Sequence, residues 1–202
     1  EEGIRGKRAE EWRLVDAVVP NSKFDNFVSE AAAEIAGKSK GSKDYSGIQL
    51  TPLSRQFHED GSVTYSLIEI EVNRSNRLAT ITLKGPNEDA PGSIESLHEV
   101  GDQNWALKLA REFDDAILHL RLNEPELGVV IFKSAGDVEQ VGAHEAFLMA
   151  NRDLDWLCRE ILLYWKRVLK RIDMTSRSLV ALVENGSCFA GLLAEILFAV
   201  DR

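Results

Sequence analysis

The strongest constraint on the fold is a continuous apolar run, residues 128–132 (GVVIF), that follows directly on a helical pattern. In residues 104–122, Trp105, Leu109, Phe113 and Ile117 recur at four-residue steps, which indicates a helix with one apolar face. A strand without polar alternation is typical of a parallel sheet that is covered on both faces. Because a helix that leads into such a strand favours βαβ connections, we predict an α/β fold.

The pattern continues in the same order to the end of the sequence. Residues 154–172 form the longest helical repeat, residues 177–183 are a second buried strand, and residues 190–200 begin a further helix. Upstream, alternating residues predict strands over 63–72, with a bulge near Leu67-Ile68, and over 78–83. The turn-forming sequence between 73 and 76 predicts that the last two strands form a hairpin. The expected order is strand, helix, strand, helix, strand, helix.

The chain also divides into two parts of unequal length. In residues 24–35 apolar side chains recur at helical spacing, and Gly37 stands where such a helix is expected to end. Residues 38–46 (KSKGSKDYS) have no apolar period and have the composition of a linker. We therefore predict one part over residues 1–40 and another over residues 41–202. The sequence opens at Glu1 without a methionine, and we expect it to be a piece of a longer protein.

Composition narrows the classes of partner. The 202 residues include 24 Lys and Arg against 33 Asp and Glu, a formal net charge of -9. Nucleic acids and anionic membranes are bound by cationic surfaces, so we expect neither as a partner. No apolar stretch is long enough to cross a membrane, and the first residues lack the apolar core of a signal peptide. These features predict a cytoplasmic protein.

Metal and nucleotide chemistry lack their usual motifs. The four histidines are far apart in the sequence, and two cysteines cannot supply a four-ligand zinc site, so we predict no metal. Cys158 and Cys188 are expected to be buried. Phosphate-binding glycine motifs are missing as well. The cationic pairs at 166–167 and 170–171 either bind phosphates or form a solvated helix end, and the second interpretation is favoured.

The stretch from Asn185 to Gly191 is the candidate site, because it joins a buried strand to a helix. Backbone N–H groups are unpaired at such a junction, and the helix dipole strengthens their attraction for a developing negative oxygen. Glu195 follows Gly191 by about one helical turn, which brings its carboxylate near the turn. The alternative, favoured on these residues alone, is a crowded turn in which only small residues fit and Glu195 is exposed or ion-paired.

The same residues resemble the crotonase, or enoyl-CoA hydratase/isomerase, superfamily. The resemblance lies in the helix at 104–122, the strand at 129–132, and SRSLVALVENGSCFAGLLAEILFAVDR, which ends near Asp201. The opening GIRGKRAEEWRLVDAVVP is similar to a later crotonase segment. A segment like the end of a crotonase domain therefore precedes one like the beginning of a crotonase domain. This order is similar to that of ring-opening lyases of the superfamily that carry two crotonase-like halves. It implies the tail of one half over 1–40 and the truncated beginning of a second half over 41–202.

The resemblance implies an enzyme that needs no cofactor. Its substrate would be a CoA thioester, 2,3-epoxybenzoyl-CoA, whose ring is opened with addition of water and release of formate. It implies that Ala190 and Gly191 lie in the turn that holds the thioester oxygen, that Glu195 is the catalytic acid or base, and that the longer protein is a homo-oligomer.

The sequence departs from the family pattern at the site itself. A run of glycines is replaced by Ala190-Gly191-Leu192-Leu193, and residues 133–138 (KSAGDV) lack the family's second donor loop. We therefore expect a mainly structural half, with the working site outside this chain. The alternatives are a non-catalytic interface module and an ordinary enoyl-CoA hydratase or isomerase.

Overall fold

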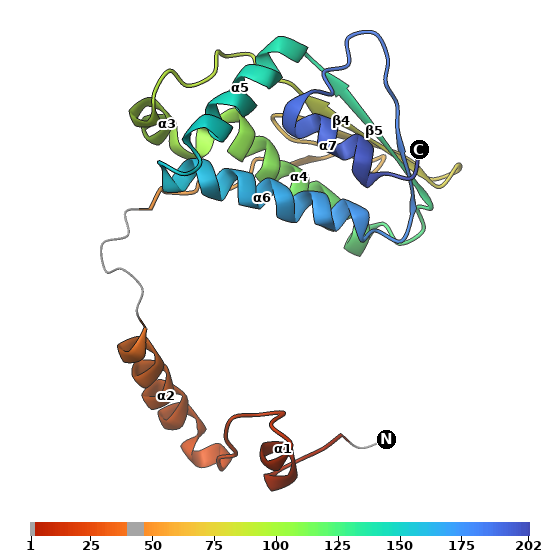
Figure 1. The fold of residues 1–202 in the computed structure, drawn as a ribbon. Helices are drawn as coiled ribbons and strands as arrows, with labels where there is room; N and C mark the ends of the chain where they lie inside the picture. The colour runs from red at the N-terminus through yellow and green to blue at the C-terminus, as the bar shows by residue number, and fades with distance from the viewer. Residues whose placement is uncertain (1–2, 40–46) are drawn as a thin grey trace. The chain divides into compact units, whose positions relative to one another are not determined.

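The computed structural model describes residues 3–39 and 47–202, and the chain divides into two compact units, 1–47 and 48–202. The first unit contains α1 (Lys7–Glu11), η1 (Asn21–Lys23) and α2 (Phe24–Lys38) (Figure 1). The predicted helix is confirmed as α2, but it continues through Gly37, which was expected to end it. Most of the predicted linker, residues 40–46, lies outside the described residues. The assignment of residues 1–40 and 41–202 to two crotonase-like halves stays a prediction.

The second unit is built on a six-stranded mixed sheet with the strand order β1-β2-β3-β4-β5-β6. The pairs β1–β2, β2–β3 and β3–β4 are antiparallel, whereas β4–β5 and β5–β6 are parallel. The predicted parallel strands and the hairpin at 73–76 are therefore confirmed. The strands are β1 (Gln56–Phe57), β2 (Val63–Thr64), β3 (Ile68–Asn73), β4 (Leu78–Lys84), β5 (Val129–Ala135) and β6 (Ser178–Ala181).

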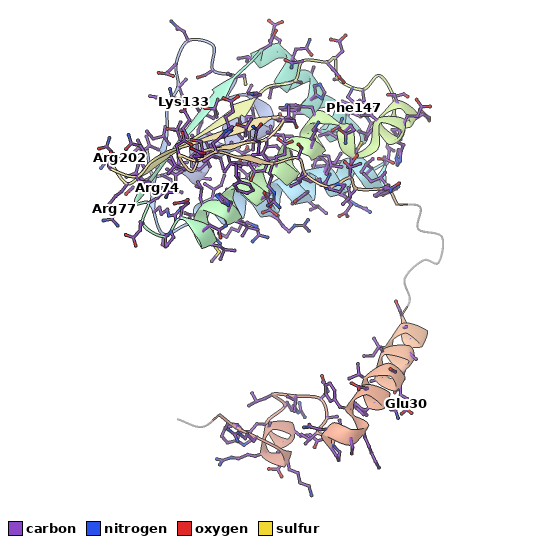
Figure 2. The ribbon with its side chains drawn as sticks, turned by 180° about the vertical axis from the view of Figure 1, so that it is seen from behind. Glu30, Arg74, Arg77, Lys133, Phe147 and Arg202 are labelled. Atoms are coloured by element: carbon purple, nitrogen blue, oxygen red, sulfur yellow. The ribbon has the colours of Figure 1, made fainter. Side chains whose placement is uncertain are left out.

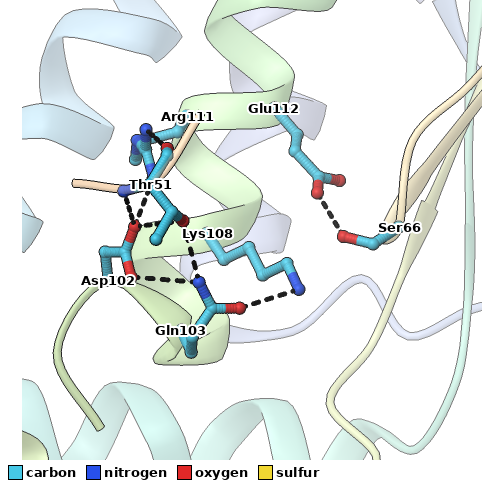
Figure 3. A network of polar contacts seen from close by, with 7 residues as sticks. All are labelled: Thr51, Ser66, Asp102, Gln103, Lys108, Arg111 and Glu112. Carbon is cyan, nitrogen blue, oxygen red and sulfur yellow. Dashed lines mark hydrogen bonds and ion pairs between the residues drawn. The ribbon is translucent and has the colours of Figure 1, made fainter. Parts of the chain in front are cut away.

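The predicted bulge at Leu67-Ile68 is wrong. The chain reverses there, because the Tyr65 N–H donates to the Ile68 carbonyl at 2.8 Å and Val63 pairs with Ile70 across two antiparallel strands. The carboxylate of Glu112, a buried residue of helix α4 (Trp105–Asn123), accepts a hydrogen bond from the Leu67 N–H at 2.7 Å. It also accepts one from the Ser66 hydroxyl, which Figure 3 shows. The change of alternation phase in the sequence therefore marks a tight turn.

The helices of this unit lie on one side of the sheet (Figure 1). Between β5 and β6 the chain forms two helices, where the sequence predicted one. The longest helix is α4, with 19 residues, and α6 has 18, so the expectation that 154–172 is the longest is wrong. The helices of this unit are α3 (Ile94–Val100), η2 (Gly101–Gln103), α4 (Trp105–Asn123), α5 (Val138–Asn151), α6 (Trp156–Asp173) and α7 (Gly191–Ala199).

The core lies between the sheet and helices α4 and α6. Alternate residues of β4 are buried, as the two-residue period of a strand requires. Phe113 of α4 packs edge-on against Phe132 of β5, with ring centroids 5.9 Å apart, and lies 6.3 Å from the ring of Trp165 of α6. The indole N–H of Trp165 donates to the Ala106 carbonyl at 2.9 Å. The packing of these three aromatic side chains makes the sheet, α4 and α6 share one core.

One edge of the sheet is occupied by the last two residues of the chain. The Leu179 N–H donates to the Asp201 carboxylate at 2.8 Å, and the Asp201 N–H donates to the Leu179 carbonyl at 3.0 Å. The Ala181 N–H donates to the Arg202 carbonyl at 2.8 Å. Asp201 therefore binds the backbone of β6 on the side that does not pair with β5.

A buried carboxylate fixes the segment that precedes the sheet to α4. Asp102 accepts the N–H and the hydroxyl of Thr51, at 2.5 and 2.7 Å, and an Arg111 nitrogen at 2.9 Å (Figure 3). Gln103 donates to its other oxygen at 3.0 Å. Burial alone would raise the pKa of Asp102, but the hydrogen bonds from Thr51 and Gln103 and the Arg111 charge outweigh it and lower the pKa to about 2.

Asp102 should make stability depend on pH in the acid range. Its pKa is about 2 in the folded chain against an ordinary 3.8, so its contribution, about 2 kcal/mol, is present above pH 4 and is lost as the pH falls toward 2. The difference in unfolding free energy between wild type and Asp102→Asn should therefore shrink by about 1 kcal/mol from pH 6 to pH 3, measured by urea unfolding. A difference that stays constant over this range would contradict the prediction.

Candidate functional site

The candidate site lies where the three parallel strands end. Loops that follow β4, β5 and β6 meet there, and two backbone hydrogen bonds join them. The Gly85 N–H donates to the Ala135 carbonyl at 2.8 Å, and the Gly136 N–H donates to the Gly186 carbonyl at 3.1 Å. The carboxyl edge of parallel strands is where open α/β sheets bind ligands. The predicted turn therefore lies at the edge of the sheet where such folds bind ligands.

The loops approach so closely that glycine is required. Gly136 has φ +149, and a Cβ added to it would lie 2.9 Å from the Gly85 Cα. A Cβ on Gly85 would lie 3.2 Å from the Cys188 Sγ. The thiol of Cys188 is fully buried. The space between the strand ends is therefore filled by the protein's own backbone and by this thiol.

Most N–H groups of the turn at residues 187–191 donate hydrogen bonds to other groups of the protein. The Ser187 N–H donates to the Glu184 carbonyl at 3.0 Å, the Cys188 N–H to the Ser134 hydroxyl at 2.9 Å, and the Ala190 N–H to the Cys188 carbonyl at 2.8 Å. Ala190, one of the two residues predicted to hold the thioester oxygen, therefore has its donor engaged. Gly191, the other, is the first residue of α7 and has φ +47, a conformation that favours glycine.

A carboxylate that the sequence did not predict lies against this turn. Glu145 of α5 is close to Gly191: a Cβ added to Gly191 would lie 2.7 Å from the Glu145 Oε2. Burial raises the pKa of Glu145, and the charge of Glu195 raises it further. The position at the start of α7 partly offsets this cost, because the helix dipole favours a negative charge there. The protein's own carboxylate thus lies against one of the two residues predicted to hold a substrate oxygen.

Glu195 itself is exposed on α7. It lines a groove of about 850 Å³ between α6 and α7, together with Leu163, Lys166 and Phe198. Its charge acts on Glu145, so the structure brings the two carboxylates near one another. The sequence thus correctly placed Glu195 one turn beyond Gly191, and it missed Glu145 because α5 was not predicted.

The chain is similar to benzoyl-CoA-dihydrodiol lyase. The protein of that name from Aromatoleum evansii is 39% identical over 201 residues, which is the whole of this chain and 36% of the relative. No protein-family model matches the chain. The predicted resemblance to a lyase of an aromatic CoA thioester is thus confirmed as a similarity in sequence. The relative's name describes a lyase of benzoyl-CoA dihydrodiol, and the chain spans 36% of that protein's length.

The remaining candidate groups have ordinary structural partners. Within residues 3–39 and 47–202, no three His, Cys, Asp or Glu side chains gather in a way that could hold a metal ion. Cys158 and Cys188 are both buried, as predicted, and burial raises the pKa of Cys158 to about 12. None of the helices in the described ranges has the length and apolar character needed to cross a membrane.

The cationic pairs on α6 are largely engaged with neighbours. Arg171 pairs with Asp114 of α4, Lys170 pairs with Asp173 at 2.5 Å, and the Arg167 guanidinium lies 4.9 Å from the centre of the Tyr164 ring. These contacts agree with the interpretation of a solvated helix end.

Proposed function

We propose that this chain is a supporting part of a lyase that acts on a benzoyl-CoA derivative, and that the turn at residues 187–191 packs without taking part in catalysis. One observation supports the proposal: the two residues predicted to hold the thioester oxygen already contact other groups of the protein. The Ala190 N–H is engaged by the Cys188 carbonyl, and the Glu145 carboxylate lies against Gly191. A negative charge that developed on a thioester oxygen beside Gly191 would be repelled by this carboxylate.

The complete reaction belongs to a longer protein in this proposal. We propose a crotonase-like architecture with two halves, in which this chain carries the tail of one and the beginning of the next. The substrate would be 2,3-epoxybenzoyl-CoA, opened by water with release of formate, and the enzyme would be a cytoplasmic homo-oligomer without a cofactor. The similarity to the Aromatoleum evansii lyase and the parallel βαβ order support this assignment.

A second candidate is a half that keeps acid–base chemistry. It is favoured by the raised pKa of Glu145, because a carboxyl group that holds its proton closer to neutral pH is suited to proton transfer. In that case the Glu145 and Glu195 pair would exchange a proton with the thioester. The two candidates predict different effects of removing these charges: little change in kcat for the first and a large loss for the second.

The test uses a hybrid of the Aromatoleum evansii lyase in which the matched region is replaced by this chain. If the chain is structural, Glu195→Gln and Glu145→Gln should each leave kcat of the hybrid within about twofold of its unaltered form. A loss of about 100-fold or more, the scale of an acid–base residue, would instead establish the second candidate. Exposed Glu160→Gln on α6 is the matched control. A hybrid with no activity at all would refute the proposed function.

A further inference from the structure

The groove between α6 and α7, here called the α6–α7 groove, has apolar walls that face solvent in a single copy of the chain. Phe198 of α7 is 83% exposed and Leu163 of α6 is 44% exposed, and both line the groove. Further apolar surface comes from side chains that are half-buried: Leu162, Leu169 and Ala199. Large apolar side chains that gather in this way on a soluble protein mark a contact surface.

The floor of the groove is formed by core residues. Trp165 and Leu192 line it and are 1% and 6% exposed. Trp165 is fixed from below, because its ring packs against Phe113 and its indole N–H donates to the Ala106 carbonyl at 2.9 Å. The exposed side chains of the walls therefore stand on an ordered base, and a partner would bind without ordering the floor first.

The two walls of the groove carry opposite charges. Lys166 on α6 and Glu195 on α7 both line it and are exposed. In residues 3–39 and 47–202, neither of them forms an ion pair. Glu195 instead acts on a like charge, Glu145, so a cation from a partner would be favoured beside it. The other two full charges on the α6 wall, Lys170 and Asp173, pair with each other at 2.5 Å.

This pattern is complementary to itself. In a dimer with two-fold symmetry each contact between two different residues occurs twice, once in each direction. If the two-fold axis runs along the groove, the α6 wall of one copy faces the α7 wall of the other. Lys166 then meets Glu195 of the second copy, and Phe198 enters the opposite groove beside Leu163. A second copy thus supplies both missing charges and the apolar side chain at once.

We propose that the α6–α7 groove is the contact surface of a two-fold symmetric dimer of this chain. The inference rests on one part of the proposed function, the homo-oligomer, and names its surface. It is tested by association and not by turnover, so the dimer and the lyase activity can fail separately. Because α7 has 9 residues, the contact is small and the dimer should be weak, with a Kd of about 10–100 µM. The chain is then monomeric at the low micromolar concentrations of an unfolding experiment.

The experiment is sedimentation equilibrium of the full chain from about 5 to about 300 µM, where a monomer–dimer equilibrium is expected. Phe198→Ala should weaken the dimer at least about tenfold, because this side chain is exposed in one copy and buried between two. Ile35→Ser is the matched apolar control. Ile35 lies on α2 and is 70% exposed, and its replacement should leave the dimer unchanged.

Charge reversal tests which residues meet. Lys166→Glu and Glu195→Lys should each weaken the dimer about fivefold, because each brings like charges together at two places. The double variant restores opposite charges and should dimerise within about twofold of the unaltered chain. Arg77→Glu is the control, since Arg77 is exposed on the turn between β3 and β4 (Figure 2) and does not line the groove.

A measurement on the unaltered chain keeps the proposal testable if a variant folds poorly. Raising the protein concentration should shift the resonances of Leu163 and Phe198 and leave those of Ile35 in place. The proposal is overturned if the chain stays monomeric at about 300 µM, or if the concentration-dependent shifts fall on α2. It is also overturned if Phe198→Ala dimerises normally, or if the double charge variant stays as weak as the single ones.

Discussion

Replacing Trp165 by alanine should lower the free energy of unfolding by about 3–5 kcal/mol. Trp165 is 1% exposed and packs against Phe113 in the middle of the core, so alanine would leave a cavity between α4 and α6. It would also remove the indole hydrogen bond to the Ala106 carbonyl. Urea unfolding followed by circular dichroism measures the loss.

Two further variants separate packing from hydrogen bonding. Trp165→Phe keeps most of the apolar volume and removes the indole donor, so it should cost about 1–2 kcal/mol. Phe198→Ala removes a side chain that is 83% exposed in the same unit and should stay within about 0.5 kcal/mol of wild type. A loss below about 1 kcal/mol for Trp165→Ala would show that α6 does not form the core described here.

Gly136→Ala should destabilise the chain by about 3 kcal/mol, because it combines backbone strain with a clash. Gly136 has φ +149, which an L side chain rarely adopts, and the new Cβ would lie 2.9 Å from the Gly85 Cα. The obstacle is backbone, so no flexible side chain can move to relieve it. The loops that follow β4 and β5 would have to separate.

The control for this variant is a glycine with space around it. Gly142 lies inside α5, and a Cβ there meets nothing within 4 Å, so Gly142→Ala should stabilise the chain by about 0.5–1 kcal/mol. Opposite signs for the two alanine substitutions are the expected result. Equal effects would mean that Gly136 and Gly85 do not meet at the sheet edge.

The regular elements could be predicted because their periods are clear. Helix α4 carries an uninterrupted apolar stripe through Phe113, and the five residues from Gly128 to Phe132 contain no polar side chain. Both patterns arise from burial: one face of the helix is buried, and the strand is covered by the residues around it. The turn at Leu67-Ile68 was misread because two antiparallel strands with their own alternation look like one strand that changes phase.

Helix α5 could not be predicted in the same way. Its buried residues are Val141, His144 and Leu148, so a polar side chain interrupts the apolar stripe. His144 is accommodated because its Nε2 lies 3.0 Å from the Glu88 carbonyl and its ring packs edge-on against Trp105. Neither partner is near in sequence. Missing α5 also meant missing Glu145, so the sequence analysis favoured a crowded turn without identifying the carboxylate that lies against Gly191.

The contacts of Asp201 and Arg202 with β6 bear on how this sheet can pair with other strands. An exposed edge strand can pair with a strand of a second molecule, which is a common route to aggregation. Asp201 and Arg202 already bind the backbone of β6 at Leu179 and Ala181, so an incoming strand would have to displace them. At the other edge, β1 is only two residues long and offers a short template. Among the described residues, a strand that approached β6 would therefore meet Asp201 and Arg202 first, and a strand that approached β1 would find two residues to pair with.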